Sequence, residues 1–239
     1  MINTVLFDLD GTLLPMDLKL FETLYFETMS KQLTDLVNPK DLMKNIWAST
    51  VAMVENTDYT TNEEVFMKDF QTRITGDLEL YKTRFDEFYD DGFLKVQAAV
   101  SKNEHIQAAV TLLKEKGYEL VIATNPLFPL KAIKHRIRWA GFEPSDFRHI
   151  THYEKSHYCK PQLQYYEEIL RNIDKNPEEC LMVGNDVQED LIAGKLGLKT
   201  YLIKNHMLHR TEDEIITDYE GSYEDFYDFA KALPYISKQ

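Results

Sequence analysis

The feature that most constrains the fold is a repeated order of helix, glycine and strand in the second half of the chain. Amphipathic segments end at Gly117, Gly141 and Gly197, and a short strand-like run follows each glycine. Glycine adopts the left-handed backbone at a helix end without the steric cost of a Cβ atom, so it commonly ends crossover helices. Alternating helices and strands predict a parallel sheet covered on both faces. We therefore expect a doubly wound, Rossmann-like α/β core.

The expected elements of this core follow from the spacing of apolar residues. Short strands are expected at residues 1–7, 119–123, 147–150, 180–183 and 199–203. Helices are expected through 106–113, and at 130–140, 161–172, 189–196 and 222–233. The core would thus begin with one strand and continue after a long interruption.

That interruption reads as a purely helical insert. No glycine occurs at positions 12–75, and apolar residues recur at helical spacing in four segments between Pro15 and Asp91, without a strand pattern. One segment begins with Thr61 and Glu64 at the spacing of a capping box. The pattern predicts a small helical bundle. We expect an all-helical domain at 15–95, an α/β core domain at 1–14 and 96–239, and contact between them only at the two chain crossings.

Composition limits the partners and the compartment. The formal net charge of the 239 residues is −13, which disfavours nucleic acid and anionic membranes as partners. No apolar run approaches the roughly 20 residues that span a bilayer, and the start of the chain lacks the basic residues and cleavage site of a signal peptide. Cys159 and Cys180 suit neither a disulfide framework nor a zinc site. We expect a cytoplasmic protein; the sequence carries no signal for its oligomeric state.

Polar residues at the end of the first expected strand form the clearest candidate site. The strand runs into Asp8-Leu9-Asp10-Gly11-Thr12. Ligands of doubly wound sheets bind at the carboxyl ends of strands, and side chains two apart on a strand share a face, so Asp8 and Asp10 can converge. Two carboxylates can hold a hard cation such as Mg²⁺, and one of them can attack a phosphoryl group. The competing interpretation is an acidic turn, since aspartate and glycine are ordinary turn residues.

This segment resembles the first motif, Asp-x-Asp-x-Thr, of the haloacid dehalogenase-like phosphohydrolases. Two further motifs resemble the family in the expected order. Thr124, followed by Asn125, ends the strand at 119–123, where the family has a serine or threonine that binds the transferring phosphoryl oxygens. Lys160, followed by Pro161 at the first position of the next helix, stands where the family has a lysine that neutralises the phosphate and the attacking carboxylate. Taken singly, a polar strand end and a surface lysine would be the simpler interpretations.

The fourth motif follows the strand at 180–183. The family usually has glycine and aspartate here, with another aspartate three or four residues later, whereas this chain has Gly184, Asn185 and Asp186, and then Asp190. The resemblance implies that one carboxylate completes a Mg²⁺ site and that the other anchors Lys160 or a metal-bound water. The motif leaves open whether Asn185 or Asp186 meets the metal; we favour Asp186, because a dication gains more from a carboxylate than from an amide.

The resemblance implies a Mg²⁺-dependent phosphatase that hydrolyses a small phosphorylated metabolite in two displacements. Asp8 would attack phosphorus to give an aspartyl-phosphate, and Asp10 would protonate the leaving oxygen and then activate water. Mg²⁺ would be held by Asp8, the backbone carbonyl of Asp10 and Asp186. The phosphate would be bound by the second and third motifs, that is by Thr124, Asn125 and Lys160. The helical insert would be the family's mobile cap over the substrate.

Other activities remain open on this scaffold. A dehalogenase would use an aspartate nucleophile without a metal but lacks the second acid, so Asp10 argues against it. A phosphonate hydrolase would need an imine-forming lysine in the cap, and no lysine there stands out. A phosphomutase shares all four motifs, whereas a non-catalytic binding protein is disfavoured by the intact motif residues. His149, His152 and His157 lie in a loop with no second acidic partner at ligand spacing, so we do not expect a zinc site among them.

Overall fold

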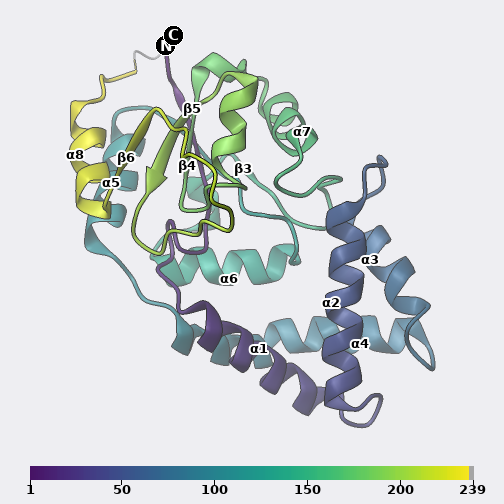
Figure 1. Cartoon of the computed structure of the whole chain (residues 1–239). Helices are drawn as coiled ribbons and strands as arrows, with labels where there is room; N and C mark the ends of the chain where they lie inside the picture. The colour runs from purple at the N-terminus through teal and green to yellow at the C-terminus, as the bar shows by residue number, and fades with distance from the viewer. Residues whose placement is uncertain (237–239) are drawn as a thin grey trace.

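The computed structural model describes residues 1–236, and its core is a six-stranded sheet (Figure 1). The strands are β1 (Thr4–Phe7), β2 (Glu119–Ile122), β3 (His149–Ile150), β4 (Cys180–Gly184), β5 (Lys199–Ile203) and β6 (Tyr219–Gly221). Their order is β3-β2-β1-β4-β5-β6, and every neighbouring pair is parallel. The expected doubly wound α/β class is confirmed. The first strand of the chain lies inside the sheet, between β2 and β4.

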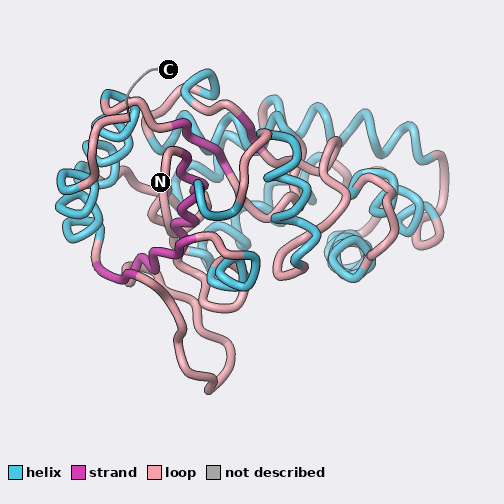
Figure 2. The backbone as a smooth tube through the Cα atoms, turned by 90° about the horizontal axis from the view of Figure 1, so that it is seen from above, coloured by secondary structure: helices cyan, strands magenta, loops and turns pink. Residues whose placement is uncertain are grey.

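Alternating residues of β1 point into two separate cores. Val5 and Phe7 belong to the larger cluster, which includes the apolar faces of α5 (Glu104–Glu115), α6 (Leu130–Ala140) and α8 (Tyr223–Ala232). Leu6 belongs to a smaller cluster with α7 (Leu163–Ile173) and the 3₁₀ segment η4 (Leu191–Leu196). The strands therefore run between helical layers, as Figure 2 shows. Because both faces are covered, the strand interiors are apolar and the reactive side chains lie at the strand ends.

Several expected core elements differ in the structure. The strand expected at 147–150 shrinks to β3, which pairs only with the end of β2, because a 3₁₀ turn, η2 (Pro144–Asp146), occupies the chain before it. The helix expected at 189–196 is the shorter segment η4, which ends at Gly197 with φ +99°. The helix expected from Pro161 begins at Leu163, since Gln162 takes the N-cap position and Pro161 lies outside the helix after a cis peptide bond. Strand β6 was not expected from the sequence.

The insert contains the four expected helices, α1 (Leu18–Gln32), α2 (Pro39–Glu55), α3 (Asn62–Gln71) and α4 (Leu78–Asp90). The expected capping box is present: Thr61 accepts from the backbone N–H of Glu64, whose side chain accepts from the backbone of Thr61. After α4, a 3₁₀ segment, η1 (Gly92–Ala99), returns the chain to the core. The two crossings lie side by side, because Met16 and Val100 form an antiparallel bridge. Within residues 1–236, no helix combines the length and the apolar character needed to cross a bilayer.

The insert also binds the core at a second place, so the expectation that it contacts the core only at the chain crossings is wrong. The backbone N–H of Asn62 donates to the carbonyl oxygen of Ser156 (2.9 Å). In the opposite direction, the Gln162 side-chain amide donates to the carbonyl oxygens of Val54 (2.7 Å) and Asn56 (3.0 Å). We call this junction, between residues 54–62 and 156–162, the clasp. These donors are satisfied across the junction, which holds the insert against the core, whereas the side-chain oxygens of Asn62 and Gln162 are buried without a partner among the described residues.

Candidate active site

Asp8 lies immediately after β1, at the carboxyl edge of the sheet. Its backbone N–H donates to the carbonyl oxygen of Val183 on β4 (2.9 Å), which fixes its place between two strands. Its carboxylate is mostly buried; one oxygen accepts from Lys160 Nζ (3.0 Å), and the Thr12 hydroxyl lies 3.4 Å from the other. The second contact is long for a hydrogen bond to a carboxylate. One oxygen of Asp8 is thus firmly oriented, and the other is left nearly free.

Lys160 is a buried cation beside Asp8. Its side chain is 1% exposed, and Nζ lies 2.6 Å from Asp190 Oδ1 as well as 3.0 Å from Asp8 Oδ1. Burial alone would lower the pKa of Lys160, but the carboxylates of Asp190 and Asp8 outweigh it and hold the pKa well above its ordinary value. Burial also raises the pKa of Asp190, which the lysine opposes. With two acids against one amine, we take Lys160 as positively charged at neutral pH.

The two residues of the second motif have different partners. The side-chain carbonyl oxygen of Asn125 accepts from the backbone N–H of Lys160 (3.2 Å), and its side-chain amide nitrogen donates to the carboxylate of Glu189 (3.1 Å). Asn125 therefore positions the backbone that carries the lysine. Thr124 is buried, and its backbone carbonyl accepts from the hydroxyl of Tyr165 (2.8 Å). Its own hydroxyl bonds to no other group within residues 1–236, so it is available to a ligand.

Asp10 is paired with an arginine that comes from α6. Arg136 is only 1% exposed, forms an ion pair with Asp10 Oδ2, and stacks 4.4 Å from the ring centroid of Phe128. The other carboxylate oxygen, Oδ1, is buried and has no partner within the described residues. Burial raises the pKa of Asp10, although Arg136 opposes the shift. A carboxyl group whose pKa is raised holds a proton more readily, which suits a general acid.

The fourth motif packs against the first. The side-chain carbonyl oxygen of Asn185 accepts from the Thr12 hydroxyl (2.9 Å), and its side-chain amide nitrogen donates to the backbone carbonyl of His206 (2.7 Å). Gly11 makes this approach possible: its φ is +84°, and a Cβ atom there would lie 2.4 Å from the Asn185 amide nitrogen. One oxygen of Asp186 accepts from two backbone N–H groups of the following turn, and the other lies 2.5 Å from Arg210 Nη1.

The metal ligands predicted from the sequence are the carboxylates of Asp8 and Asp186 and the backbone carbonyl of Asp10. Asp10 is turned to Arg136 and Asp186 to Arg210, and in the part of the chain that the structure describes no three acidic, histidine or cysteine side chains converge as a metal site. Because the predicted Asp10 ligand is its backbone carbonyl, the pairing of its carboxylate with Arg136 leaves that prediction untested. The nearby donors, from Asp8, Asn185 and Asp186, are all oxygens, which suits a hard cation.

The histidine-rich loop lies apart from this arrangement. His152 Nδ1 contacts the carboxylate of Glu154 (2.7 Å), and His157 Nδ1 contacts that of Glu168 (2.5 Å). The ring of Tyr59 stacks on His157 with centroids 3.8 Å apart. These histidines therefore have separate partners.

Sequence reasoning missed three residues of the site. Arg136 had a signal, because it interrupts the apolar face formed by Ile133 and Ile137 on a strongly amphipathic helix. A charge on such a face indicates a buried partner. Tyr165, which holds the carbonyl of Thr124, and Arg210, which lies on Asp186, belong to an ordinary helix and a long loop. Nothing in the sequence around them indicates a role.

Comparison with known proteins places this geometry in context. A sequence model described as haloacid dehalogenase-like hydrolase matches residues 2–197. Pyrophosphatase PpaX of Anoxybacillus flavithermus (strain DSM 21510 / WK1) is 28% identical over 204 residues, which cover 83% of this chain and 82% of the relative.

Two solved structures share the fold. The HAD-hydrolase YfnB of Bacillus subtilis, whose structure is described as bound to magnesium, aligns with a TM-score of 0.59 at 20% identity, over 96% of this chain and 98% of that chain. CbbY of Rhodobacter sphaeroides in complex with phosphate aligns with a TM-score of 0.58 at 18% identity, over 94% and 96% of the two chains. At these identities the similarity concerns the fold alone.

Proposed function

Because this chain belongs to the haloacid dehalogenase-like hydrolases, we propose that it is a phosphatase acting on a small-molecule phosphate monoester. The observation that carries the proposal is the placement of Asp8 at the carboxyl edge of the sheet, in contact with a buried lysine. A carboxylate in this position can attack phosphorus in line and form an aspartyl-phosphate, which water then hydrolyses. Phosphoryl transfer needs chiefly positioning and charge neutralisation, and both are built around Asp8.

Each neighbour of Asp8 has a distinct role in this proposal. Lys160 would neutralise the phosphoryl oxygens, and Asp190 and Asn125 would keep it in place. The Thr124 hydroxyl would donate to one of those oxygens. Such preorganised donors stabilise a transition state because they do not need to reorient during the reaction.

Asp10 would act as the general acid and base. Among the described residues its buried oxygen Oδ1 has no partner, so it can give a proton to the leaving oxygen and later take one from water. Arg136 would hold the carboxyl group in place through its other oxygen. We regard Arg136 as a positioning residue.

We propose Mg²⁺ as the cofactor, held by Asp8, the backbone carbonyl of Asp10 and Asp186. When bound, it would supply positive charge to the phosphoryl oxygens. One carboxylate oxygen of Asp186 lies beside Arg210. A metal ion can displace this side chain, because it is half-exposed and carries a positive charge like the metal. The side-chain groups of Asn185 are instead bonded to Thr12 and to a backbone carbonyl. This difference supports Asp186 as the ligand.

Hydrolysis of a phosphoric anhydride is the second candidate. It is favoured by the similarity to proteins named pyrophosphatase, of which the relative from Anoxybacillus flavithermus is one. The same attack by Asp8 would serve, with phosphate in place of an alcohol as the leaving group.

The first prediction tests the phosphatase and its metal together. With 4-nitrophenyl phosphate and MgCl₂ the protein is expected to release both nitrophenol and inorganic phosphate, and excess EDTA should lower the rate about 100-fold or more. Added Mg²⁺ should restore the rate, whereas Ca²⁺ should inhibit, since its looser coordination would misplace the attacking carboxylate. Full activity in EDTA would contradict the metal assignment and favour metal-independent dehalogenase chemistry. Release of nitrophenol in a single burst equal to the enzyme concentration, without release of phosphate, would indicate a phosphoenzyme that awaits another acceptor, as in a phosphomutase.

The second prediction separates the two neighbours of the fourth motif. D186A is expected to raise the Mg²⁺ concentration at half-maximal rate about tenfold or more, because a carboxylate ligand is lost. N185A, the matched variant one residue away, should raise it less. Metal titrations of the two variants provide the measurement, and the reverse order would show that Asn185 is the ligand.

A further inference from the structure

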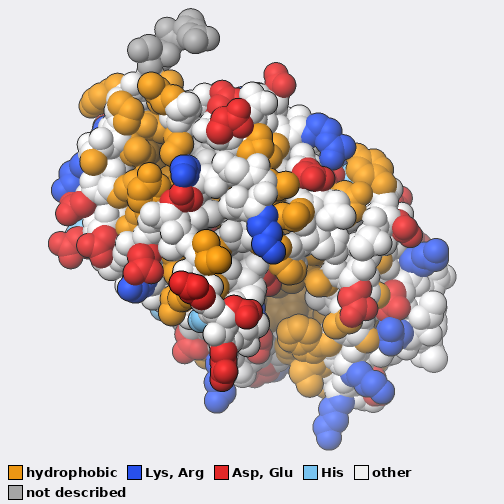
Figure 3. All heavy atoms as spheres, turned by 45° about the horizontal axis from the view of Figure 1, so that its top comes forward, with side chains coloured by type: hydrophobic (Ala, Val, Ile, Leu, Met, Phe, Trp, Pro, Cys, Tyr) orange, Lys and Arg blue, Asp and Glu red, His pale blue; other side chains and the backbone are white. Residues whose placement is uncertain are grey.

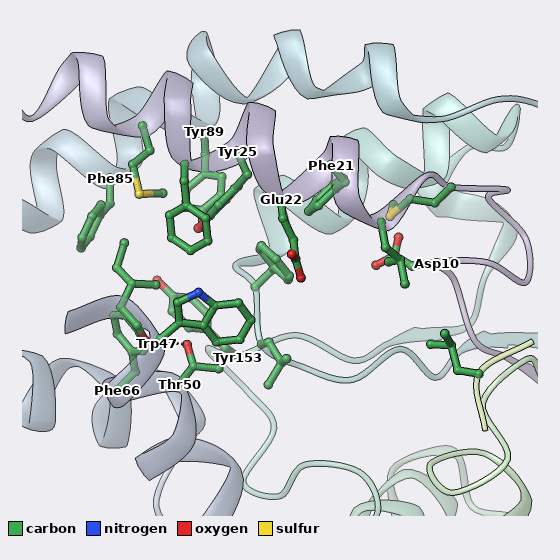
Figure 4. A pocket seen from close by; sticks show the side chains of 18 of the residues that line it. Asp10, Phe21, Glu22, Tyr25, Trp47, Thr50, Phe66, Phe85, Tyr89 and Tyr153 are labelled. Atoms are coloured by element: carbon green, nitrogen blue, oxygen red, sulfur yellow. Dashed lines mark hydrogen bonds between the residues drawn. The ribbon is translucent and has the colours of Figure 1, made fainter. Parts of the chain in front are cut away.

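A largely aromatic cavity of about 340 Å³ lies between the insert and the core, and Asp10 is at one end of it (Figure 4). Phe66 and Phe85 lie at the opposite end, and Trp47 faces the wall that contains Tyr25. This volume is within the usual range for small-molecule sites, about 300–1,000 Å³. Figure 3 shows a hollow on one face that is bordered by hydrophobic side chains.

We propose that this cavity binds the body of the substrate, and that the body is uncharged and contains an apolar ring. The inference rests on the proposed phosphatase function, because a phosphate held at Asp8 would direct the rest of the molecule past Asp10. It names a substrate class that differs from pyrophosphate and from sugar bisphosphates, since both carry a second charged group.

Several neutral polar groups of the cavity are already used within the protein. The hydroxyls of Tyr25 and Tyr89 bond to each other (2.9 Å), and the hydroxyl of Thr50 donates to the carbonyl oxygen of Ile46 in its own helix (2.9 Å). Burial raises the pKa of Tyr25 to about 12, so this phenol is neutral. The Tyr153 hydroxyl and the Trp47 indole N–H also line the cavity and form no hydrogen bond within residues 1–236. The walls therefore present mainly rings and methyl groups, and they offer few partners to a body rich in hydroxyls.

The charges at the cavity also disfavour a second anion. Besides Asp10, the charged lining residues are Glu22 and Arg210. Figure 4 shows the carboxylate of Glu22 directed into the cavity, and within residues 1–236 it forms no ion pair. Arg210 lies beside Asp186 and 3.7 Å from Glu189, so Glu189 remains as its counter-ion when a metal takes Asp186. A second phosphate would thus lose its hydration among rings and face the carboxylate of Glu22.

Two phosphate esters with similar leaving groups test the inference. The value of kcat/KM for 2-(2-naphthyl)ethyl phosphate is expected to exceed that for ethyl phosphate by about 100-fold, because the enzyme buries the ring surface only with the first. Pyrophosphate should be a poorer substrate than the naphthyl ester. Acetyl phosphate, a small activated substrate, reports on the phosphatase chemistry without using the cavity. Binding of 2-(2-naphthyl)ethanol, measured by calorimetry, reports on the cavity without any chemistry.

A matched pair of variants on α2 links these effects to the cavity. Trp47 lines the cavity and is 48% exposed, so W47A should fold; it is expected to reduce both the preference for the naphthyl ester and the affinity for the alcohol about tenfold. Val51, on the same helix and 49% exposed, is outside the lining, and V51A should change neither quantity.

The two proposals fail in different ways. If acetyl and ethyl phosphates are hydrolysed but the naphthyl group gives no advantage and the alcohol does not bind, the cavity inference is overturned and the phosphatase stands. If no phosphate ester or acetyl phosphate is hydrolysed while the alcohol binds and W47A weakens it, the proposed function fails and the cavity's ligand class is supported. A preference for pyrophosphate over the naphthyl ester would also overturn the inference.

Discussion

D8N is expected to lower kcat about 10³-fold or more while the protein remains folded. An amide cannot attack phosphorus, so the step that forms the aspartyl-phosphate is lost. The amide oxygen can still accept the hydrogen bond from Lys160, and Asp190 still neutralises the lysine, so the buried charge keeps a partner. Steady-state kinetics with 4-nitrophenyl phosphate and near-ultraviolet circular dichroism measure the two expectations.

The matched control is D58N. Asp58 is exposed, lies in the loop between α2 and α3, and makes no side-chain hydrogen bond or ion pair within residues 1–236. This variant should retain the parental rate, which shows that the loss in D8N comes from its position. Activity of D8N within tenfold of the parent would remove Asp8 from the role of nucleophile.

D10N should lower the rate about 10²–10⁴-fold for esters of poorly acidic alcohols, the range typical of a lost general acid. With 2,4-dinitrophenyl phosphate the first half-reaction should suffer much less, because that leaving group needs no proton. The structure motivates this dependence because Asp10 lines the cavity and its buried oxygen Oδ1 has no hydrogen-bond partner within residues 1–236.

Single-turnover measurements of phosphoryl transfer isolate the first step of D10N from the hydrolysis of the intermediate. The ratio of the two substrates' losses is the decisive quantity, since misfolding or a displaced Arg136 would lower both equally. Equal losses for good and poor leaving groups would therefore rule out Asp10 as the acid.

The acidic and basic motif residues could be located from the sequence because each one follows an apolar run or precedes a helix. Asp8 comes directly after β1, and Asp186 comes two residues after the end of β4. In a parallel sheet those ends meet at one edge, so position in the chain fixes position in space. The doubly wound class followed from the same regularity.

Partners of these residues were not predictable, because they depend on tertiary packing. Arg136 reaches Asp10 from the middle of α6, and the clasp joins residues about 100 positions apart in sequence. The bounds of the short edge strand β3 and the presence of the polar strand β6 were not predictable for a related reason. Each of these strands takes its conformation from one neighbouring strand rather than from its own apolar pattern. The cavity could not be predicted from the sequence either, since the aromatic residues that line it have the same spacing as residues of a helical core.

The clasp makes the two halves of the molecule thermodynamically dependent on each other. Gln162, which bonds to the insert, is two residues from Lys160, which bonds to Asp8. A movement of the insert that breaks these bonds therefore perturbs the lysine, and a ligand that fixes the lysine favours the bonded position of the insert. Linkage requires such an effect to be equal in both directions. If phosphate at its site raises the affinity of the aromatic cavity for its ligand by some factor, a ligand in the cavity must raise the affinity for phosphate by the same factor.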